Sequence, residues 1–471
     1  MVQVWIRRGV PWFMVALWVG CAGDRPSPRS PEEARSPVSE AASEEPEEPV
    51  KEPEPPAVRE QEWVAAVRAG HTPAEAGAAW VEAVRTVEQR AGEFEFDAGR
   101  LTGIDLAGGR VSVQGADLPH LLAFPHLRRL RIAGSDLTDD DLSVLAQLTG
   151  LRELVLRYAP IGAEGLRRLG ALSELTSLDL QRAPQVDDEA LAVLGTFSQL
   201  TGLGLVDGLF RGEALEHLVP LAGLQRLDLR GCAQVAAEHL VWLQDLPALQ
   251  VLRLGGAAID DDCLAVLAEI PTLRSLTLED ASVTDAGLEQ LAELPLVDLS
   301  LARCFRITDD AFASLARFGQ LQTLYLRDIL VSGSGFEHLA DLDALSSLRL
   351  RQTGVHDTSL EHLEELVSLR RLELSAGLVS DDGLAAVGRL VRLEHLELAD
   401  SRLTDAGIDH LGDLGQLVRL NLADNAEITD ASVPILGGLT TLRYLDLRGT
   451  SLSERGWQEL RRQLPECEFE R

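Results

Sequence analysis

Apolar residues recur along the chain in one pattern, L-x-x-L-x-L, whose starts lie 23 to 26 residues apart. The pattern begins at Leu127, Leu151, Leu175, Leu200, Leu224, Leu249, Leu273, Leu296, Leu321, Leu345, Leu369, Leu393, Leu417 and Leu442, with a weaker copy at Leu101. Each copy ends in the apolar–polar alternation of a strand with one buried face. The residues that follow, for example 309–318, carry apolar side chains at helical spacing. The sequence therefore predicts about fifteen strand–helix units over residues 101–464.

A small or polar residue separates the strand from the helix in most units. These residues are Ser135, Ala183, Cys232, Ala257, Cys304, Thr353, Ser401, Asn425 and Thr450, with Ile329 as the exception. We expect a tight corner there, where a large side chain would not fit.

A hydroxyl residue followed by carboxylates precedes many of the predicted helices. The hydroxyl residues are Thr138, Thr284, Thr308, Thr404, Thr429, Ser380 and Ser453. A hydroxyl at a helix N-cap accepts a hydrogen bond from a free backbone N–H, and acidic residues next to it face the positive end of the helix dipole. The runs 139–141 and 260–262 are triple aspartates that could also bind calcium. Their recurrence at helix starts favours capping.

Both ends of the repeat array need a cap, because a stack of repeats otherwise exposes apolar surface. Residues 61–100 are predicted to form an N-terminal helical cap: Thr72 opens a helix whose inner face carries Trp80, Val84 and Val87, and residues 93–96 form a strand. A last helix carries Trp457, Leu460 and Leu464, and residues 465–471, with Cys467 and Phe469, form a terminal strand.

The units resemble leucine-rich repeats, and in particular the cysteine-containing, ribonuclease-inhibitor-like repeats also found in F-box repeat proteins. The segment LSLARCFRITD, residues 299–309, carries this resemblance most clearly. The resemblance implies an α/β solenoid, a horseshoe with parallel strands on the concave face and helices on the convex face.

If the fourth and sixth positions of each unit point into the core, the third, fifth and seventh must face the concave side. These positions hold twelve arginines: Arg129, Arg131, Arg157, Arg226, Arg230, Arg253, Arg327, Arg349, Arg351, Arg371, Arg419 and Arg448. They also hold eight carboxylates: Glu153, Asp179, Asp228, Glu279, Asp298, Glu373, Glu397 and Asp446. Tyr325 and Tyr444 lie on the same face. The concave face is thus predicted to be basic in a chain of net charge −32.

Arginine and tyrosine are enriched at protein-binding hot spots. The densest cluster is Tyr325, Arg327, Arg349, Arg351 and Arg371, on three adjacent predicted strands, and Arg226, Arg230 and Arg253 form a second group. We predict that these residues bind an acidic or carboxylate-bearing protein or peptide partner. The alternative is that the arginines pair with neighbouring carboxylates, as Arg371 could with Glu373.

The remaining composition narrows the function further. A net charge of −32 argues against a nucleic-acid partner. The cysteines after Cys21 lack the spacings of a zinc site and are expected to be small buried residues. His338 and His362 fall at equivalent helix positions of adjacent units, where metal binding is an alternative to copied repeat sequence. No nucleophile elbow, phosphate loop or zinc-protease motif is present, so we expect no enzyme and no cofactor.

The N-terminal segment predicts export and a membrane tether. Arg7 and Arg8 precede an apolar run of residues 9–20, which is too short to span a bilayer as a helix but is typical of a signal peptide. The run ends in LWVGC, residues 17–21, which resembles a bacterial lipobox; that resemblance implies lipidation of Cys21 and a place in the bacterial cell envelope. An ordinary secretory signal is the alternative. Residues 22–60 are rich in proline and glutamate and are expected to form a disordered linker.

Three classes of function fit these expectations. The first is a non-enzymatic, membrane-tethered recognition module that binds protein or peptide ligands on its concave face. The second is a substrate-recognition adaptor like the F-box repeat proteins, against which the secretory start argues. The third is a structural protein of the envelope.

Overall fold

The structure is a computed structural model that describes residues 60–73, 76–109, 111–375 and 378–471. The chain separates after Pro56, and the described residues belong to its second unit, Ala57–Arg471. The expected signal peptide, with Cys21, and all of the expected linker except its last residue lie outside the described residues.

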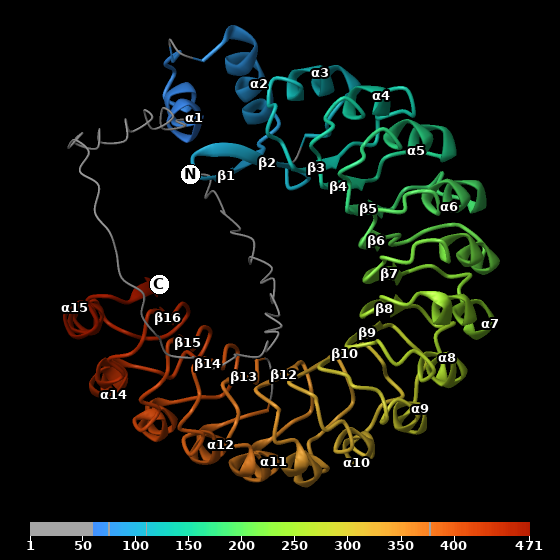
Figure 1. Ribbon diagram of the computed structural model, residues 1–471. Coiled ribbons are helices and arrows are strands. Elements are labelled where there is room, and N and C mark those ends of the chain that lie inside the picture. Colours follow the sequence, from blue (N-terminus) through green and yellow to red (C-terminus); the bar gives the residue numbers. More distant parts are fainter. Residues whose placement is uncertain (1–59, 74–75, 110, 376–377) are drawn as a thin grey trace, which may run out of the picture. The chain divides into compact units, whose positions relative to one another are not determined.

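One sheet runs through the second unit (Figure 1). Its strands are β1 (Glu93–Asp97), β2 (Arg100–Leu106), β3 (Arg129–Ala133), β4 (Glu153–Arg157), β5 (Ser177–Gln181), β6 (Gly202–Gly204), β7 (Arg226–Arg230), β8 (Val251–Gly255), β9 (Ser275–Glu279), β10 (Asp298–Ala302), β11 (Thr323–Arg327), β12 (Ser347–Arg351), β13 (Arg371–Glu373), β14 (His395–Glu397), β15 (Arg419–Asn421), β16 (Tyr444–Asp446) and β17 (Glu468–Glu470).

Short helices alternate with the strands. The α-helices are α1 (Glu60–Arg68), α2 (Ala78–Gln89), α3 (Leu118–Leu121), α4 (Leu142–Leu145), α5 (Ala163–Leu169), α6 (Asp188–Leu194), α7 (Ala237–Leu240), α8 (Asp261–Leu267), α9 (Asp285–Gln290), α10 (Ala311–Leu315), α11 (Asp357–Leu360), α12 (Asp381–Val387), α13 (Asp405–Ile408), α14 (Val433–Gly438) and α15 (Glu454–Gln463). The 3-10 helices are η1 (Gly115–Asp117), η2 (Gly212–Leu218), η3 (Val241–Asp245), η4 (Phe336–Asp341), η5 (Glu361–Glu365), η6 (Asp409–Leu411) and η7 (Asp430–Ser432).

Consecutive strands from β2 to β17 pair in parallel, and β1 pairs antiparallel with β2. The strands line the inner side of an open arc and the helices line its outer side (Figure 1). The predicted α/β solenoid is therefore confirmed. The repeating leucines explain it: Leu324 and Leu326 of β11, like their counterparts in neighbouring repeats, are at most 1% exposed, and each such leucine stabilises the stack by about 1.5–3 kcal/mol.

The corner after each strand is made by the eighth residue of the repeat, one position before the small residue. In most repeats this residue has a left-handed backbone conformation, with φ between 51° and 118°. The residues are Tyr158, Arg182, Asp207, Gly231, Gly256, Asp280, Arg303, Asp328, Gln352, Asp400, Asp424 and Gly449. The small residue that follows is often buried; Asn425, for example, donates to the backbone oxygens of Leu398, Leu422 and Ala423. A small residue is therefore needed at this position, as expected, but the backbone changes direction one residue earlier.

The carboxylates at the helix starts bind the next repeat, in an arrangement that we call the aspartate ladder. Each accepts two hydrogen bonds from a Thr or Ser that follows 23 or 24 residues later, one from the backbone N–H at 2.8–3.1 Å and one from the hydroxyl at 2.5–2.7 Å. The pairs are Asp261–Thr284, Asp285–Thr308, Asp309–Ser332, Asp357–Ser380, Asp381–Thr404, Asp405–Thr429 and Asp430–Ser453.

The aspartate ladder also explains a recurrent glycine in the phrase T-D-A-G. A Cβ atom at Gly407 would lie 2.3 Å from Oδ1 of Asp381, which belongs to the preceding repeat. Gly287, Gly383 and Gly456 meet Asp261, Asp357 and Asp430 in the same way. The glycine therefore leaves room for the carboxylate of its neighbour.

The helix-capping prediction needs correction. Thr404, Thr429 and Ser453 do accept a bond from a backbone N–H of their own helix. Thr284 and Ser380 stand at the N-cap without such a bond, and their hydroxyls donate to the preceding aspartate.

Thr138 and Thr308 are not N-caps, since α4 and α10 begin four and three residues after these threonines. The triple aspartates are engaged by protein donors: Asp139 accepts from the Gly162 N–H, and Asp260 caps α8.

The aspartate ladder predicts a loss of stability in acid. Burial of Asp309 and Asp405 disfavours their charge, but the hydrogen bonds that they accept outweigh burial and hold each pKa below its usual value. The unfolded chain therefore binds protons first, so this stabilisation is complete above about pH 4 and is lost as the pH falls through the lower folded pKa. Urea unfolding at pH 7, 5 and 3.5 should show it. The double variant Asp309→Asn, Asp405→Asn should lose less stability than the wild type over that range; an equal loss would contradict the assignment.

The array is closed at both ends. Trp80, Val84 and Val87 of α2 are buried, but α2 begins at Ala78 after Gly77 rather than at Thr72, and α1 precedes it. The strand expected near residues 93–96 is β1. At the far end α15 buries Trp457 and Leu460, and β17 extends the sheet.

Cys232, Cys263 and Cys304 are buried free thiols, and burial raises their pKa values to about 12, 11 and 11. Cys467 is only half-buried. Among the described helices, none combines the length and the apolar character needed to cross a membrane.

Candidate functional site

Side chains at the third, fifth and seventh positions of the repeats form three rows along the concave face. The parallel register places like positions side by side, so Tyr325, Arg349 and Glu373 are neighbours in the fifth-position row. In the seventh-position row Arg327 lies beside Arg351. In the third-position row Arg371 lies beside His395. The predicted face is therefore present, and the partners of each arginine decide what it can bind.

The centre of the fifth-position row is a fixed unit of three side chains. The Cζ atom of Arg349 lies 4.5 Å from the centre of the Tyr325 ring, in cation–π contact. Its Nε donates to Oε2 of Glu373 at 2.7 Å, and Glu373 is 8% exposed. Arg349 is thus neutralised by a buried carboxylate and held over an aromatic ring.

This pairing differs from the one that we considered from the sequence. Arg371 and Glu373 are two residues apart on one strand, but Glu373 pairs with Arg349 on the neighbouring strand. Arg349 stands directly opposite Glu373 in the parallel register, and opposed residues of adjacent strands lie about 4.8 Å apart, which brings the two side chains within reach of each other.

Glu279 on β9 pairs with three arginines, two from the seventh-position row and one from the eighth position of the β10 repeat. It receives Arg230 at 3.2 Å, Arg303 at 2.5 Å and Arg327 at 3.4 Å. The hydrogen bond with Asp228 is the main cause that raises the pKa of Arg230 above its ordinary value, with burial opposing it. Arg303 was missed by the sequence analysis because it follows the strand at the left-handed eighth position.

Arg351 and Arg371 differ from their neighbours. Both side chains are exposed, and neither makes a hydrogen bond or an ion pair with any residue in the described part of the chain. Beside Arg371, burial lowers the pKa of His395 and the positive charge of Arg371 lowers it further. His395 is therefore neutral at pH 7, and these two guanidinium groups carry uncompensated charge on β12 and β13.

The eight predicted binding residues fall into two groups. Tyr325, Arg327, Arg349, Arg351 and Arg371 lie together on β11, β12 and β13. Arg226, Arg230 and Arg253 lie on β7 and β8, so β9 and β10 separate them from the first group.

Within the second group, Arg230 and Arg253 both pair with Asp228. Arg226 is exposed, with its guanidinium over Gly202 of β6. The alternative of local pairing therefore applies to Arg230, Arg253, Arg327 and Arg349.

The rim beyond the strand ends carries exposed apolar side chains that the sequence analysis missed. Phe305, Leu330 and Leu378 occupy the same position in the repeats of β10, β11 and β13, and are 58%, 72% and 48% exposed. Leu209 in the repeat of β6 is a further exposed leucine at this position, and most other repeats hold small or polar residues there, such as Ser282, Gly354 and Arg402. That contrast within the repeat was the signal available in the sequence. Leu330 and Leu378 follow β11 and β13, the strands that carry Arg327 and Arg371.

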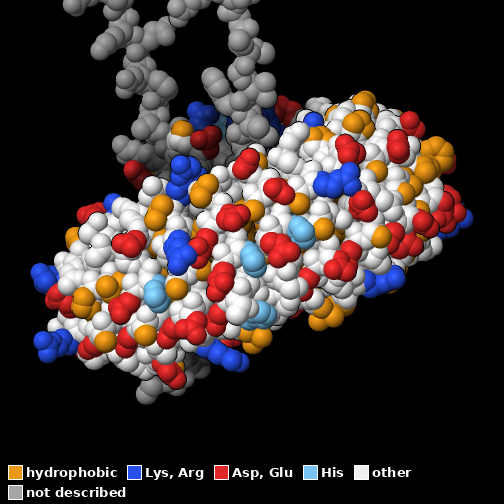
Figure 2. Space-filling model, turned by 90° about the horizontal axis from the view of Figure 1, so that it is seen from below, with side chains coloured by type: hydrophobic (Ala, Val, Ile, Leu, Met, Phe, Trp, Pro, Cys, Tyr) orange, Lys and Arg blue, Asp and Glu red, His pale blue; other side chains and the backbone are white. Residues whose placement is uncertain are grey.

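The outer face has a different character. Figure 2 shows it over the repeats near α10 to α14, where acidic side chains are numerous and histidines lie among them. His338 and His362 lie on η4 and η5. Within the described ranges, no group of three or more His, Cys, Asp or Glu side chains is placed to hold a metal ion.

One family model and several solved structures match the chain. The family model described as Leucine Rich repeat matches residues 125–146. A leucine-rich-repeat protein of Leptospira interrogans is 19% identical, with 75% of this chain and 86% of that chain covered and a TM-score of 0.46. An internalin of Listeria monocytogenes is 20% identical, with 83% and 94% covered and a TM-score of 0.41.

The ectodomain of the receptor kinase GASSHO1/SCHENGEN3 of Arabidopsis thaliana, solved in complex with CASPARIAN STRIP INTEGRITY FACTOR 2, is 18% identical, with 79% and 50% covered and a TM-score of 0.34. No curated protein matches the chain. The resemblance to the F-box subtype of the repeat stays a prediction.

Proposed function

Because this chain folds as a leucine-rich-repeat horseshoe, we propose that it is a recognition module that binds a protein or peptide ligand on the concave face of β11–β13. Solenoids of this kind present extended concave surfaces, and binding is their general use. The observation that carries the proposal is the pair of exposed, unpartnered arginines, Arg351 and Arg371, on a sheet whose other arginines are largely paired.

The chemistry of the ligand follows from these two charges. A guanidinium group presents a fork of donors that matches a carboxylate, and it binds more strongly when both partners are charged. Since Arg349 is already occupied by Glu373, the acidic groups of a ligand are expected at Arg351 and Arg371. Tyr325 and Arg349 form a rigid surface in the row between Arg351 and Arg371, and this rigidity limits the entropy lost on binding.

The apolar rim extends this surface. Phe305 and Leu330 belong to adjacent repeats, and both are more than half exposed. Monomeric proteins seldom expose several large apolar groups together unless the surface binds something. We infer that the ligand places an apolar segment over the rim and an acidic segment over the concave arginines.

We further propose that the module is tethered in a bacterial envelope through a lipid on Cys21. The lipobox-like LWVGC and the acidic, proline-rich residues 22–60 support this proposal. A proline-rich linker spans about 3 Å per residue, so it would hold the horseshoe well away from the membrane. Labelling with a radioactive fatty acid, compared between the wild type and Cys21→Ala, tests this part separately.

Charge reversal at the two free arginines should strongly weaken ligand capture. We expect the double variant Arg351→Glu, Arg371→Glu to recover about tenfold less partner, or still less, in a crosslinking pull-down from the native envelope, because like charges in an interface cost several kcal/mol. Raising the salt concentration should also weaken capture by the wild type, because salt screens the attraction between the arginines and an acidic ligand.

The matched control is the double variant Arg392→Glu, Arg461→Glu. It makes the same change in net charge at two exposed positions, one before β14 and one on α15. It should capture as the wild type does. Equal capture by both double variants would contradict the assigned site, and thermal unfolding curves would establish that each variant is folded.

A further inference from the structure

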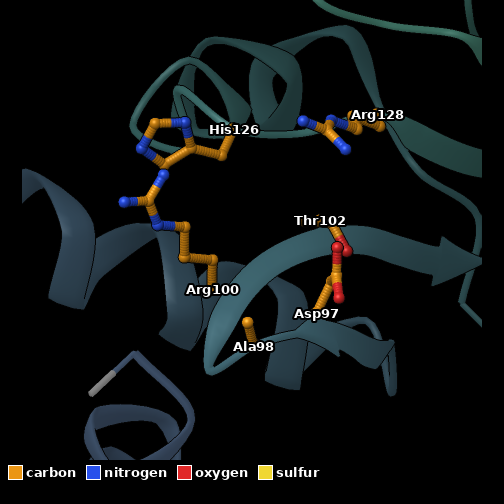
Figure 3. Close-up of a pocket in the computed structure, with 6 residues that line it drawn as sticks. All are labelled: Asp97, Ala98, Arg100, Thr102, His126 and Arg128. Atoms are coloured by element: carbon orange, nitrogen blue, oxygen red, sulfur yellow. The ribbon is translucent and has the colours of Figure 1, made fainter. Parts of the chain in front are cut away.

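A cavity of about 320 Å³ lies at the N-terminal end of the repeat array, far along the sheet from β11–β13 (Figure 3). It is bordered by the β1–β2 turn and by the loop that leads into β3. Its lining residues are Asp97, Ala98, Arg100, Thr102, His126 and Arg128. Three of these six carry guanidinium or imidazole groups, in a chain that is otherwise strongly acidic.

The local fold brings these residues together from the N-terminal cap and the first two repeats. Ala98 and Gly99 have φ values of 47° and 80°, so they form a tight two-residue turn that sets Asp97 directly opposite Arg100. Thr102 and Arg128 occupy the same position of the first and second repeats, and the Arg128 N–H donates to the Thr102 carbonyl at 2.8 Å.

Arg128 lacks the partner that its counterpart has in the next repeat. Arg152, 24 residues later, makes two hydrogen bonds of 3.1 Å to Glu174. At the position equivalent to Glu174, the repeat of Arg128 has Gly150. The side chains of Arg128, Arg100 and His126 make no hydrogen bond or ion pair with the residues that the structure describes. The cavity therefore holds unused donors.

Thr102 adds a second, independent sign that a ligand belongs here. Its side chain is 6% exposed, and its Oγ1 has no hydrogen-bond partner among the described residues. A buried hydroxyl without a partner is costly, so it indicates a missing group. In Figure 3 Arg100 and His126 stand on one side of the cavity and Arg128 on the other, with Thr102 and Asp97 at its floor.

We propose that this cavity binds a phosphate group that carries one proton, either as the free ion or as a terminal monoester. A carboxylate has two oxygens and is satisfied by a single guanidinium fork, whereas a tetrahedral oxyanion accepts bonds from donors on several sides. Arg100, Arg128, His126 and the Thr102 hydroxyl would supply those donors. Asp97 would accept a hydrogen bond from the protonated oxygen of the phosphate, and sulfate has no such proton at neutral pH.

Calorimetry with inorganic phosphate and the full-length chain, in chloride buffer at pH 7, tests the proposal. We expect wild-type binding that becomes about tenfold weaker, or weaker still, in Arg128→Ala, because charge-assisted hydrogen bonds are lost. Arg152→Ala, the same substitution at the paired counterpart, should bind as the wild type does. No binding by the wild type, or equal binding by Arg128→Ala, would overturn the site. Urea unfolding without phosphate separates loss of binding from loss of fold.

Sulfate and glycerol 3-phosphate define the ligand further. Sulfate should bind the wild type at least about tenfold more weakly than phosphate, and Asp97→Asn should narrow that difference, because an unpaired carboxylate repels the fully ionised anion. Equal binding of the two anions by the wild type would overturn the role of Asp97. Binding of glycerol 3-phosphate as tight as that of phosphate would assign a terminal monoester, and binding of phosphate alone would assign the free ion. This site stands independently of the concave-face ligand.

Discussion

Phe336→Ala should lower the free energy of unfolding by about 3–5 kcal/mol, as expected when a fully buried aromatic ring is removed from a core. Phe336 is 0% exposed and meets Phe312 of the preceding repeat edge to face, with ring centres 4.9 Å apart. Urea unfolding followed by circular dichroism measures the change. The Phe336 ring therefore fills the core of its own repeat and also packs against the preceding repeat.

The effect should be largest on cooperativity, because the aspartate ladder stops at this repeat. Gly333 stands where other repeats have the ladder aspartate, so no carboxylate reaches the repeat that follows. In its place the Ser359 hydroxyl donates to the Ser332 carbonyl at 2.7 Å. Each repeat contacts only its neighbours. Phe336→Ala weakens the β11 repeat on the side of β10, and the missing aspartate leaves it without a ladder bond on the side of β12, so unfolding is expected to divide into two steps at this repeat.

Phe305→Ala is the matched control, since it removes the same ring from a position that is 58% exposed. It should change the free energy of unfolding by no more than about 0.5 kcal/mol. If the two alanine variants unfold alike, Phe336 does not hold adjacent repeats together as the structure indicates.

Asp405→Ala should cost about 2 kcal/mol, because it removes the charged acceptor of several hydrogen bonds between repeats. The Asp405 carboxylate accepts from the N–H of Thr429 at 2.8 Å and from its hydroxyl at 2.6 Å. It also accepts from the hydroxyl of Ser432, which is 0% exposed. Without the carboxylate, a backbone donor and a buried hydroxyl lose their partner. Thermal and urea unfolding at pH 7 measure the cost.

Asp409→Ala tests whether position or charge is responsible. Asp409 lies four residues further on in the same repeat and is exposed. Removing it changes the net charge equally, and the free energy of unfolding should stay within about 0.5 kcal/mol of the wild type. A comparable loss in both variants would mean that general electrostatics, rather than the ladder, accounts for the effect.

The sequence predicted the fold in detail because the repeat multiplies every local signal. One copy of L-x-x-L-x-L is weak, but its recurrence sets the strand register, the buried leucines and the face on which Tyr325 and Arg349 lie. The same periodicity placed the predicted residues of β11–β13 on adjacent strands. What failed were local details, such as the helix starts at Thr138 and Thr308, where the first turn is not helical.

The partners of the charged side chains were decided only by the tertiary structure. A sequence position fixes the row and the strand of Glu373, but its pairing with Arg349 rather than Arg371 depends on distances across the sheet. The same holds for the three arginines on Glu279 and for the aspartates that reach the next repeat. The phosphate cavity arises where one repeat meets the cap, so no periodic pattern marks it. The pattern of leucines determined which surface is exposed, whereas contacts between groups distant in the chain determined which of its charges remain free.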